Sequence, residues 1–121
     1  MAAKEKITWT FAVQIAGGPT VSASDSMELA GYEKWRLVIA NNKTGVAKIG
    51  AVDGVSLVAI VPSKASDKLT YKQGSADVKL DRAHVLAGEG AAQFVKDAFP
   101  DLTIENKTGA EVTVDILVGR A

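Results

Sequence analysis

The tetrapeptide Asn-Lys-Thr-Gly occurs twice, at 42–45 and at 106–109, and each copy stands between two apolar runs. Asn is favoured at the first position of a type I turn, where its side chain can bond the backbone two residues on. Gly at the fourth position accepts a positive φ without a Cβ clash, as a G1-bulge hairpin requires. The sequence therefore predicts that Asn42, Gly45, Asn106 and Gly109 are turn residues of two β-hairpins.

Both copies also match the Asn-X-Thr acceptor sequence for N-glycosylation. Glycosylation requires a secretory route, and the charged segment Met1–Lys6 has no apolar stretch of signal-peptide length. We therefore interpret both copies as plain turns and expect no signal peptide.

Two segments near the N-terminus alternate between apolar and polar residues. In 7–15 the residues of one face are all apolar: Ile7, Trp9, Phe11, Val13 and Ile15. This period of two predicts a strand with one buried face. Residues 20–29 alternate again, but Asp25 interrupts the apolar face, which predicts a bulge or a break near Asp25–Ser26.

Further strands are predicted at 34–40, 46–52, 55–61, 69–72, 77–80, 102–105 and 111–118. The run 55–61 is almost wholly apolar, which indicates a central strand covered on both faces. In the last strand the predicted core-facing residues are Val112, Val114, Ile116 and Val118. Apolar residues in 90–99 instead follow helical spacing, and Pro100 stands just beyond them.

These elements predict an all-β fold, an antiparallel β-sandwich of about eight strands with one short helix near residues 90–99. Strands and helices do not alternate, which argues against a parallel sheet. The two Asn-Lys-Thr-Gly copies begin 64 positions apart, at 42 and 106, which favours a Greek-key or jelly-roll-like arrangement. A chain of 121 residues is expected to form a single domain, 1–121.

Charge and composition limit the partners. Fourteen basic residues balance fourteen acidic ones, so we expect neither a nucleic-acid nor a membrane partner. The longest apolar stretch, 55–61, is too short to cross a bilayer. The chain contains no cysteine, which excludes disulfides, thiolate metal sites and cysteine nucleophiles. A soluble protein without a cofactor is expected.

Catalytic motifs are weak in this sequence. His84 is the single histidine, and no nucleophile motif accompanies it. Gly88-Glu89-Gly90 precedes the predicted helix, but Glu89 would repel a phosphate, so we interpret it as a helix start. We predict no catalytic, cofactor-binding or metal-binding residue, and no enzymatic activity.

The aromatic residues leave a second hypothesis open. Trp9 and Trp35 lie in phase with the apolar faces of their strands, which favours core packing. Tyr32, beside Gly31, is the candidate ligand-facing aromatic residue. A carbohydrate-binding β-sandwich module is therefore the alternative function.

Small residues, frequent in strands such as 46–52, permit the close approach of another sheet and leave strand edges unguarded. This pattern favours a homo-oligomer or a larger protein assembly.

The closing segment carries a family resemblance. A strand that ends at Leu80 leads to Val-Leu-Ala-Gly-Glu-Gly-Ala at 85–91, then to the predicted helix, Pro100, and the final strand Val-Thr-Val-Asp-Ile-Leu-Val at 112–118. This pattern resembles the small β-sandwich decoration or cement proteins of tailed-bacteriophage capsids. The resemblance covers about a third of the chain. It implies a non-enzymatic virion protein that acts as an oligomeric module on a capsid lattice.

Overall fold

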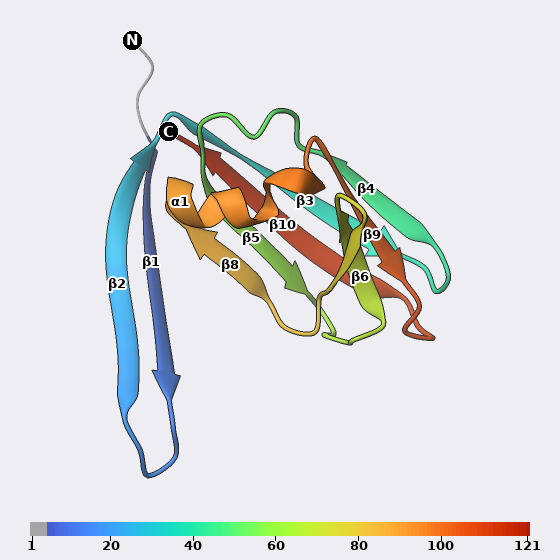
Figure 1. The fold of residues 1–121 in the computed structure, drawn as a ribbon, viewed down its shortest axis with the longest axis horizontal. Coiled ribbons are helices and arrows are strands. Elements are labelled where there is room, and N and C mark those ends of the chain that lie inside the picture. The colour runs from blue at the N-terminus through green and yellow to red at the C-terminus, as the bar shows by residue number, and fades with distance from the viewer. Residues whose placement is uncertain (1–4) are drawn as a thin grey trace.

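The computed structural model describes residues 5–121 (Figure 1). Residues 1–4, part of the segment in which no signal peptide is expected, lie outside the described residues. The described residues form ten strands and a short helical segment. Their bounds are β1 (Glu5–Gln14), β2 (Thr20–Leu29), β3 (Gly31–Ile39), β4 (Thr44–Lys48), β5 (Val55–Pro62), β6 (Leu69–Gln73), β7 (Ala76–Lys79), β8 (His84–Ala87), α1 (Glu89–Ala92), η1 (Gln93–Ala98), β9 (Asp101–Asn106) and β10 (Val112–Arg120).

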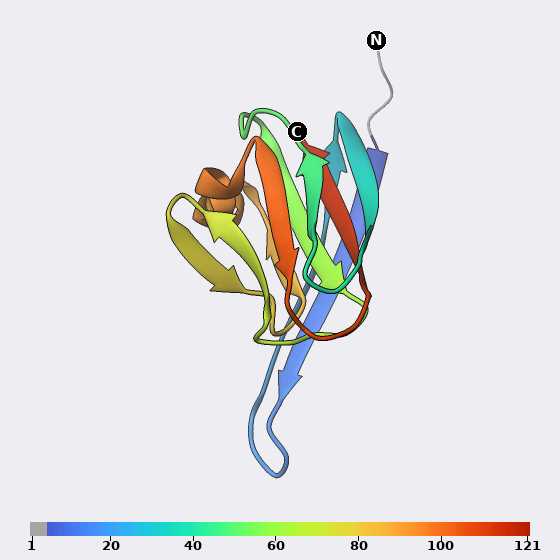
Figure 2. The ribbon, with the colours of Figure 1, turned by 90° about the vertical axis from the view of Figure 1, so that its right-hand side faces the viewer.

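Eight of these strands form two antiparallel sheets, in the orders β3-β10-β5-β8 and β4-β9-β6-β7, which pack together as a sandwich (Figure 2). The pairs β3·β10, β4·β9, β5·β8 and β6·β7 are nested, as if one long hairpin had been rolled up. This nesting is the jelly-roll arrangement. The predicted all-β antiparallel sandwich with one short helix is confirmed.

The core lies between the two sheets and is built by alternate residues of each strand. The predicted inward face of β10 is correct, because Val112, Val114, Ile116 and Val118 are all buried. Leu102 and Ile104 of β9 face them from the other sheet and are fully buried. The helical segment adds Ala92 and Val95 to the same core. Each of these residues loses its water contacts on folding, which is the main force that holds the sheets together.

The predicted hairpins at the two Asn-Lys-Thr-Gly copies are wrong. β3 and β4 belong to different sheets, and so do β9 and β10. Each copy therefore crosses from one sheet to the other. Gly109 has the expected positive φ, +93°, but in the first copy it is Asn42 that is left-handed, with φ +64°, while Gly45 lies within β4. Turn residues fit any tight reversal of the chain, and they do not determine which strands pair.

β1 and β2 form a separate two-stranded hairpin that extends beyond the sandwich (Figures 1 and 2). We call residues 5–29 the arm. Its register is unbroken from Glu5 opposite Leu29 to Gln14 opposite Thr20, so the predicted bulge near Asp25–Ser26 is wrong. Asp25 lies opposite Trp9 on an exposed face, where water solvates the carboxylate and no bulge is needed to turn it outward.

The arm is fixed to the sandwich at its root. Leu29 is fully buried, and a Cβ at Gly119 of β10 would overlap its Cδ1 atom. The amide of Ala30 donates a hydrogen bond to the carbonyl of Arg120 at 2.8 Å. The end of β10 therefore holds the root, while the remainder of the arm projects.

Candidate functional site

The predicted buried face of the first strand is exposed from Phe11 outwards, whereas Ile7 and Trp9, nearer the sandwich, are half-buried. Exposed fractions on the arm are 49% for Phe11, 56% for Val13, 58% for Ile15 and 63% for Val21. The rings of Trp9 and Phe11 stack with centroids 6.3 Å apart. Trp9 therefore lies on the arm, and its predicted place in the core is wrong, whereas Trp35 packs against the core as predicted. The alternating pattern correctly predicted which residues of β1 share a face, but not that this face lies outside the core.

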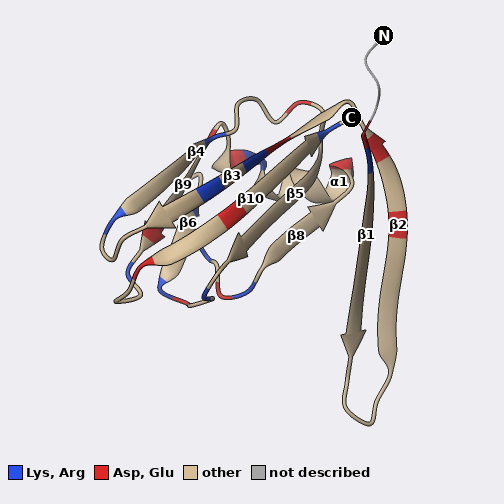
Figure 3. Ribbon diagram, turned by 180° about the vertical axis from the view of Figure 1, so that it is seen from behind, with Lys and Arg blue, Asp and Glu red and all other residues tan. Residues whose placement is uncertain are grey.

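The outer half of the arm carries no charge. No Lys, Arg, Asp or Glu occurs from Ile7 to Ser24, and Figure 3 shows the projecting part of β1 and β2 in tan. Charged side chains, lysine above all, normally protect long strands from pairing with other chains. The arm lacks that protection on both of its strands. Its outer part, from Phe11 to Ala23, is an uncharged and amphipathic surface suited to protein–protein contact.

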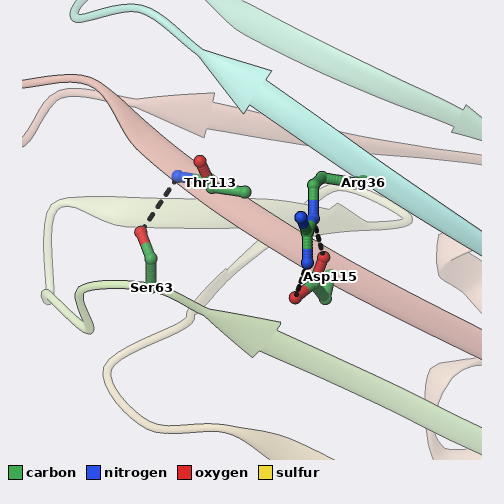
Figure 4. A network of polar contacts seen from close by, with 4 residues as sticks. All are labelled: Arg36, Ser63, Thr113 and Asp115. Atoms are coloured by element: carbon green, nitrogen blue, oxygen red, sulfur yellow. Dashed lines mark hydrogen bonds and ion pairs between the residues drawn. The ribbon is translucent and has the colours of Figure 1, made fainter.

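The outer face of the β3-β10-β5-β8 sheet has a charged half. Arg36 of β3 donates to Asp115 of β10 through Nε at 2.8 Å and through Nη2 at 3.4 Å (Figure 4). Hydrogen bonding to Arg36 lowers the pKa of Asp115, and the same contact raises the pKa of Arg36. Beside this pair, the amide of Thr113 donates to Ser63 Oγ at 3.0 Å. This half is suited to contact with water.

The other half of the same face is apolar. Ala59 of β5 lies directly between Leu117 of β10 and Val85 of β8 in the sheet register. Val85 is 57% exposed, and Val61 is exposed as well. β5 and β8 contain no Lys, Arg, Asp or Glu. We call the outward side chains of this half the β5–β8 patch: Ala59, Val61, Val85, Ala87 and Leu117.

Tyr32, the candidate ligand-facing residue, is 56% exposed at the start of β3. It lines a surface depression of about 480 Å³ together with Gly31, Glu33 and Arg120. The guanidinium of Arg120 is already engaged, because it donates to the carbonyls of Ile49, Ala51 and Asp53. Tyr32 is thus accessible to a ligand, and its binding role stays a prediction.

His84 joins the two sheets. Its Nδ1 atom lies 2.9 Å from the hydroxyl of Tyr71, which is buried on β6 of the opposite sheet. Burial raises the pKa of Tyr71, so the phenol stays protonated at neutral pH. A groove of about 390 Å³, which the exposed Phe94 also lines, opens beside the pair. Within residues 5–121 there is no cluster of three or more His, Cys, Asp or Glu residues that could hold a metal ion.

The two Asn-Lys-Thr-Gly copies bind each other. The amide of Asn42 donates to the carbonyl of Asn106 at 2.7 Å, and the amide of Asn106 donates to the carbonyl of Lys43 at 3.0 Å. The side chain of Asn106 is fully buried, and its Nδ2 donates to Ile39 and Ala110. Because the side-chain amide of Asn106 is buried and its nitrogen already donates two hydrogen bonds, it is not accessible for glycosylation. This copy is therefore a structural joint of the sandwich.

The sequence analysis did not predict the positions or contacts of three residues: Asn41, Val85 and Phe11. Asn41, which precedes the first tetrapeptide, accepts a hydrogen bond from the amide of Gly109 through Oδ1 at 2.9 Å. Val85 was assigned to no strand, because β8 has just four residues. Phe11 was assigned to the core. The long uncharged run from Ile7 to Ser24 was the available signal for an arm.

Among residues 5–121, no helix has the length and apolar character that crossing a bilayer requires. Comparison of the chain with protein-family models, with curated proteins and with solved structures finds no match.

Proposed function

We propose that this chain is a non-enzymatic structural protein that acts through protein–protein contacts, as a decoration or cement protein on the capsid of a tailed bacteriophage. One observation carries the proposal, namely the exposed apolar face of the outer arm, where Phe11, Val13, Ile15 and Val21 lie in a stretch without charged residues. Each large apolar side chain that moves from water into an interface contributes roughly 1.5–3 kcal/mol. Phe11, Val13, Ile15 and Val21 are each about half exposed, so each can contribute part of that free energy to a contact with a protein partner.

Two further features support this proposal. The closing segment resembles the capsid decoration class in the order of its elements. The jelly roll is also a common architecture of viral capsid proteins, and this support is an analogy at the level of the fold. A module that joins a compact sandwich to a projecting arm can bridge neighbouring subunits of a lattice.

Co-sedimentation with purified tailed-phage capsids tests the proposal. The chain is expected to enter the capsid fraction and to saturate at a fixed ratio to the major capsid protein. Thr10→Lys, on the polar face of the arm, provides a matched control for Phe11→Lys, which should reduce the bound amount. The proposal is contradicted if the chain stays in the supernatant when it is mixed with capsids of a phage that encodes it.

A carbohydrate-binding module is the second candidate, because Tyr32 is exposed beside a depression that also contains the polar side chain of Glu33. Exposed aromatic rings stack on sugar faces, and jelly rolls also occur in lectins. Titration calorimetry against a panel of oligosaccharides tests this function. Tyr32→Ala should abolish any binding that is found, whereas Val46→Ala, at an exposed apolar position of the other sheet, should preserve it.

A further inference from the structure

We propose that the groove beside His84 and Tyr71 binds a small, neutral aromatic molecule that carries a hydrogen-bond donor next to an acceptor, as an aromatic amide does. The inference goes beyond the proposed assembly function and does not depend on it, because the groove is lined by residues of the sandwich and not of the arm. An unpaired buried oxygen, a free imidazole nitrogen and an exposed aromatic ring carry the inference.

The groove lies where both sheets of the sandwich end. β8 is the last strand of one sheet, and β7 is the last strand of the other. The helical segment adjoins this side, where the amide of Gly74, in the β6–β7 turn, donates to the carbonyl of Asp97 at 3.1 Å (Figure 2). The groove has a volume of about 390 Å³ and is lined by residues of β6, β7, β8 and η1. Sites for small molecules usually have volumes of about 300–1,000 Å³, so a single small molecule can fill it.

Gln73, which lines the groove, has an unpaired side-chain oxygen. Its Oε1 atom is buried and has no hydrogen-bond partner among residues 5–121. A buried acceptor without a donor destabilises the folded chain, and most buried acceptors in proteins are paired. An N–H group of a bound molecule would remove this penalty. The ligand is therefore expected to carry a hydrogen-bond donor.

His84 supplies the complementary donor. Its Nδ1 atom lies 2.9 Å from the hydroxyl of Tyr71, and the imidazole makes no other hydrogen bond in the part of the chain that the structure describes. Burial raises the pKa of Tyr71, so the phenol keeps its proton and can donate it to Nδ1. A neutral imidazole then carries its own proton on Nε2 and can donate it to an acceptor in the groove.

The remaining wall of the groove is apolar and uncharged. Val78, Leu86 and Val95 line it, together with Phe94 of η1, which is 73% exposed. Of the described residues, no Lys, Arg, Asp or Glu lines the groove, so an ion would lose its hydration there without meeting an opposite charge. A flat aromatic ring can instead stack on Phe94. These walls favour a neutral aromatic ligand.

Two matched probes test the donor. Benzamide and acetophenone share a ring and a carbonyl group, but only benzamide has an N–H donor. Titration of the isotope-labelled chain, followed by NMR, should give saturable shifts at His84, Leu86 and Phe94 with both probes. Benzamide should bind at least about tenfold more tightly, or ~1.4 kcal/mol, because its N–H group pairs with Gln73 Oε1.

Substitutions in the groove test the site itself. Gln73→Met keeps the approximate size of the side chain and removes the oxygen, so the two probes should bind this variant with equal affinity. Phe94→Ala should weaken both probes by the same factor, because it removes the stacking ring. Val38→Ala, at an exposed position of β3, is the control and should bind both probes as wild type does.

Thermal unfolding gives a second measurement. Gln73→Met should raise the unfolding midpoint of the free chain, because the oxygen that it removes is buried and has no partner to lose. Benzamide should raise the midpoint of wild type more than the midpoint of Gln73→Met, because a ligand stabilises the folded state in proportion to its affinity.

The inference is wrong if benzamide gives no saturable shifts, or if the shifts lie outside the groove. It is equally wrong if acetophenone binds wild type as tightly as benzamide, or if Gln73→Met keeps the preference for benzamide. A lower unfolding midpoint in free Gln73→Met would show that water already pairs with the oxygen, and would overturn the need for a donor. None of these results bears on capsid binding, which Gln73→Met should leave unchanged.

Discussion

The side-chain amide of Asn106 donates a hydrogen bond to the carbonyl of Ile39 at 2.8 Å, across 67 positions of sequence. Its carbonyl oxygen accepts from the amide of Thr108 at 2.9 Å and from the hydroxyl of Thr108 at 2.7 Å. One fully buried side chain therefore satisfies backbone groups of both segments that cross between the sheets. Buried networks of this kind are stabilising only when every member is paired.

Asn106→Ala should lower the free energy of unfolding by about 2–4 kcal/mol, because it leaves buried backbone groups without partners. Urea denaturation measures this change. Asn42→Gly is the control at the other copy and should be within about 0.5 kcal/mol of wild type, since glycine accepts the positive φ found there. A loss below about 0.5 kcal/mol in Asn106→Ala would show that water replaces the network.

Two glycines should respond to substitution for different reasons. A Cβ at Gly45 would lie 2.8 Å from Cγ1 and Cδ1 of Ile39, so Gly45→Ala should cost about 1–3 kcal/mol through overpacking. Around Gly109 there is open space, and Gly109→Val should cost about 1–2 kcal/mol through backbone strain alone. Thermal unfolding of both variants, with Gly31→Ala as the control, separates steric overlap from strain. Equal costs for Gly45→Ala and Gly31→Ala would contradict the predicted overlap.

Val114→Asp should prevent folding, because it places an unpaired charge in the core between the sheets. Thr113→Lys, one position earlier, points to the outer face and should leave the fold intact. Circular dichroism and gel filtration distinguish the two results. A folded Val114→Asp together with an unfolded Thr113→Lys would mean that the register of β10 is displaced by one residue.

The ion pair between Arg36 and Asp115 should contribute to acid sensitivity. The pKa of Asp115 is lowered in the folded state by its hydrogen bond to Arg36. Its contribution is therefore complete above the ordinary value of 3.8 and is lost as the pH falls through the lower folded value. Asp115→Asn should flatten the decline of stability below that pH, by a small amount because both side chains are exposed.

Asp67→Asn, in the exposed loop before β6, is the control for this acid titration. The two variants are compared by urea denaturation midpoints across the acid range. A decline in Asp115→Asn as steep as in wild type would show that the pair does not contribute.

Gly119→Ala should loosen the root of the arm, because the added methyl group would displace Leu29. Hydrogen exchange at the amide of Ala30, which bonds to Arg120, should become faster, and proteolysis within the arm should increase. Gly31→Ala adds the same methyl group where no other atom lies within 4 Å and should leave both rates unchanged. Unchanged exchange in Gly119→Ala would place the anchor elsewhere.

The strands could be predicted from the sequence, but their partners could not. Alternation places Val112 and Val114 on one face of β10, because a period of two is a local property of the strand. Pairing of β10 with β3 and β5 depends on residues more than fifty positions away. Local turn chemistry at 106–109 therefore predicted a reversal correctly and assigned it to the wrong strands.

The arm shows the limit of amphipathic patterns. Phe11 and Val13 alternate with polar residues as core residues do. Burial of such an apolar face is favourable whether its cover is the same chain or another molecule. The pattern does not distinguish cover from the same chain from cover by another molecule. The uncharged run 7–24 carried that information, because a strand that only covers its own core usually has charged residues on its outer face.

His84 was expected to have no catalytic role. Its contact with Tyr71 of the opposite sheet could not be predicted from the sequence, because it depends on how the two sheets pack.

The nested pairing of the jelly roll has a consequence for how the chain is made. β3 leaves the ribosome early, but its sheet partner β10 follows all the other described strands. The sandwich can therefore close only after β10 has been synthesised, and such non-local pairing folds slowly. The arm is a local hairpin and can form within microseconds of its synthesis. The arm can therefore be complete on the nascent chain while the sandwich is still open.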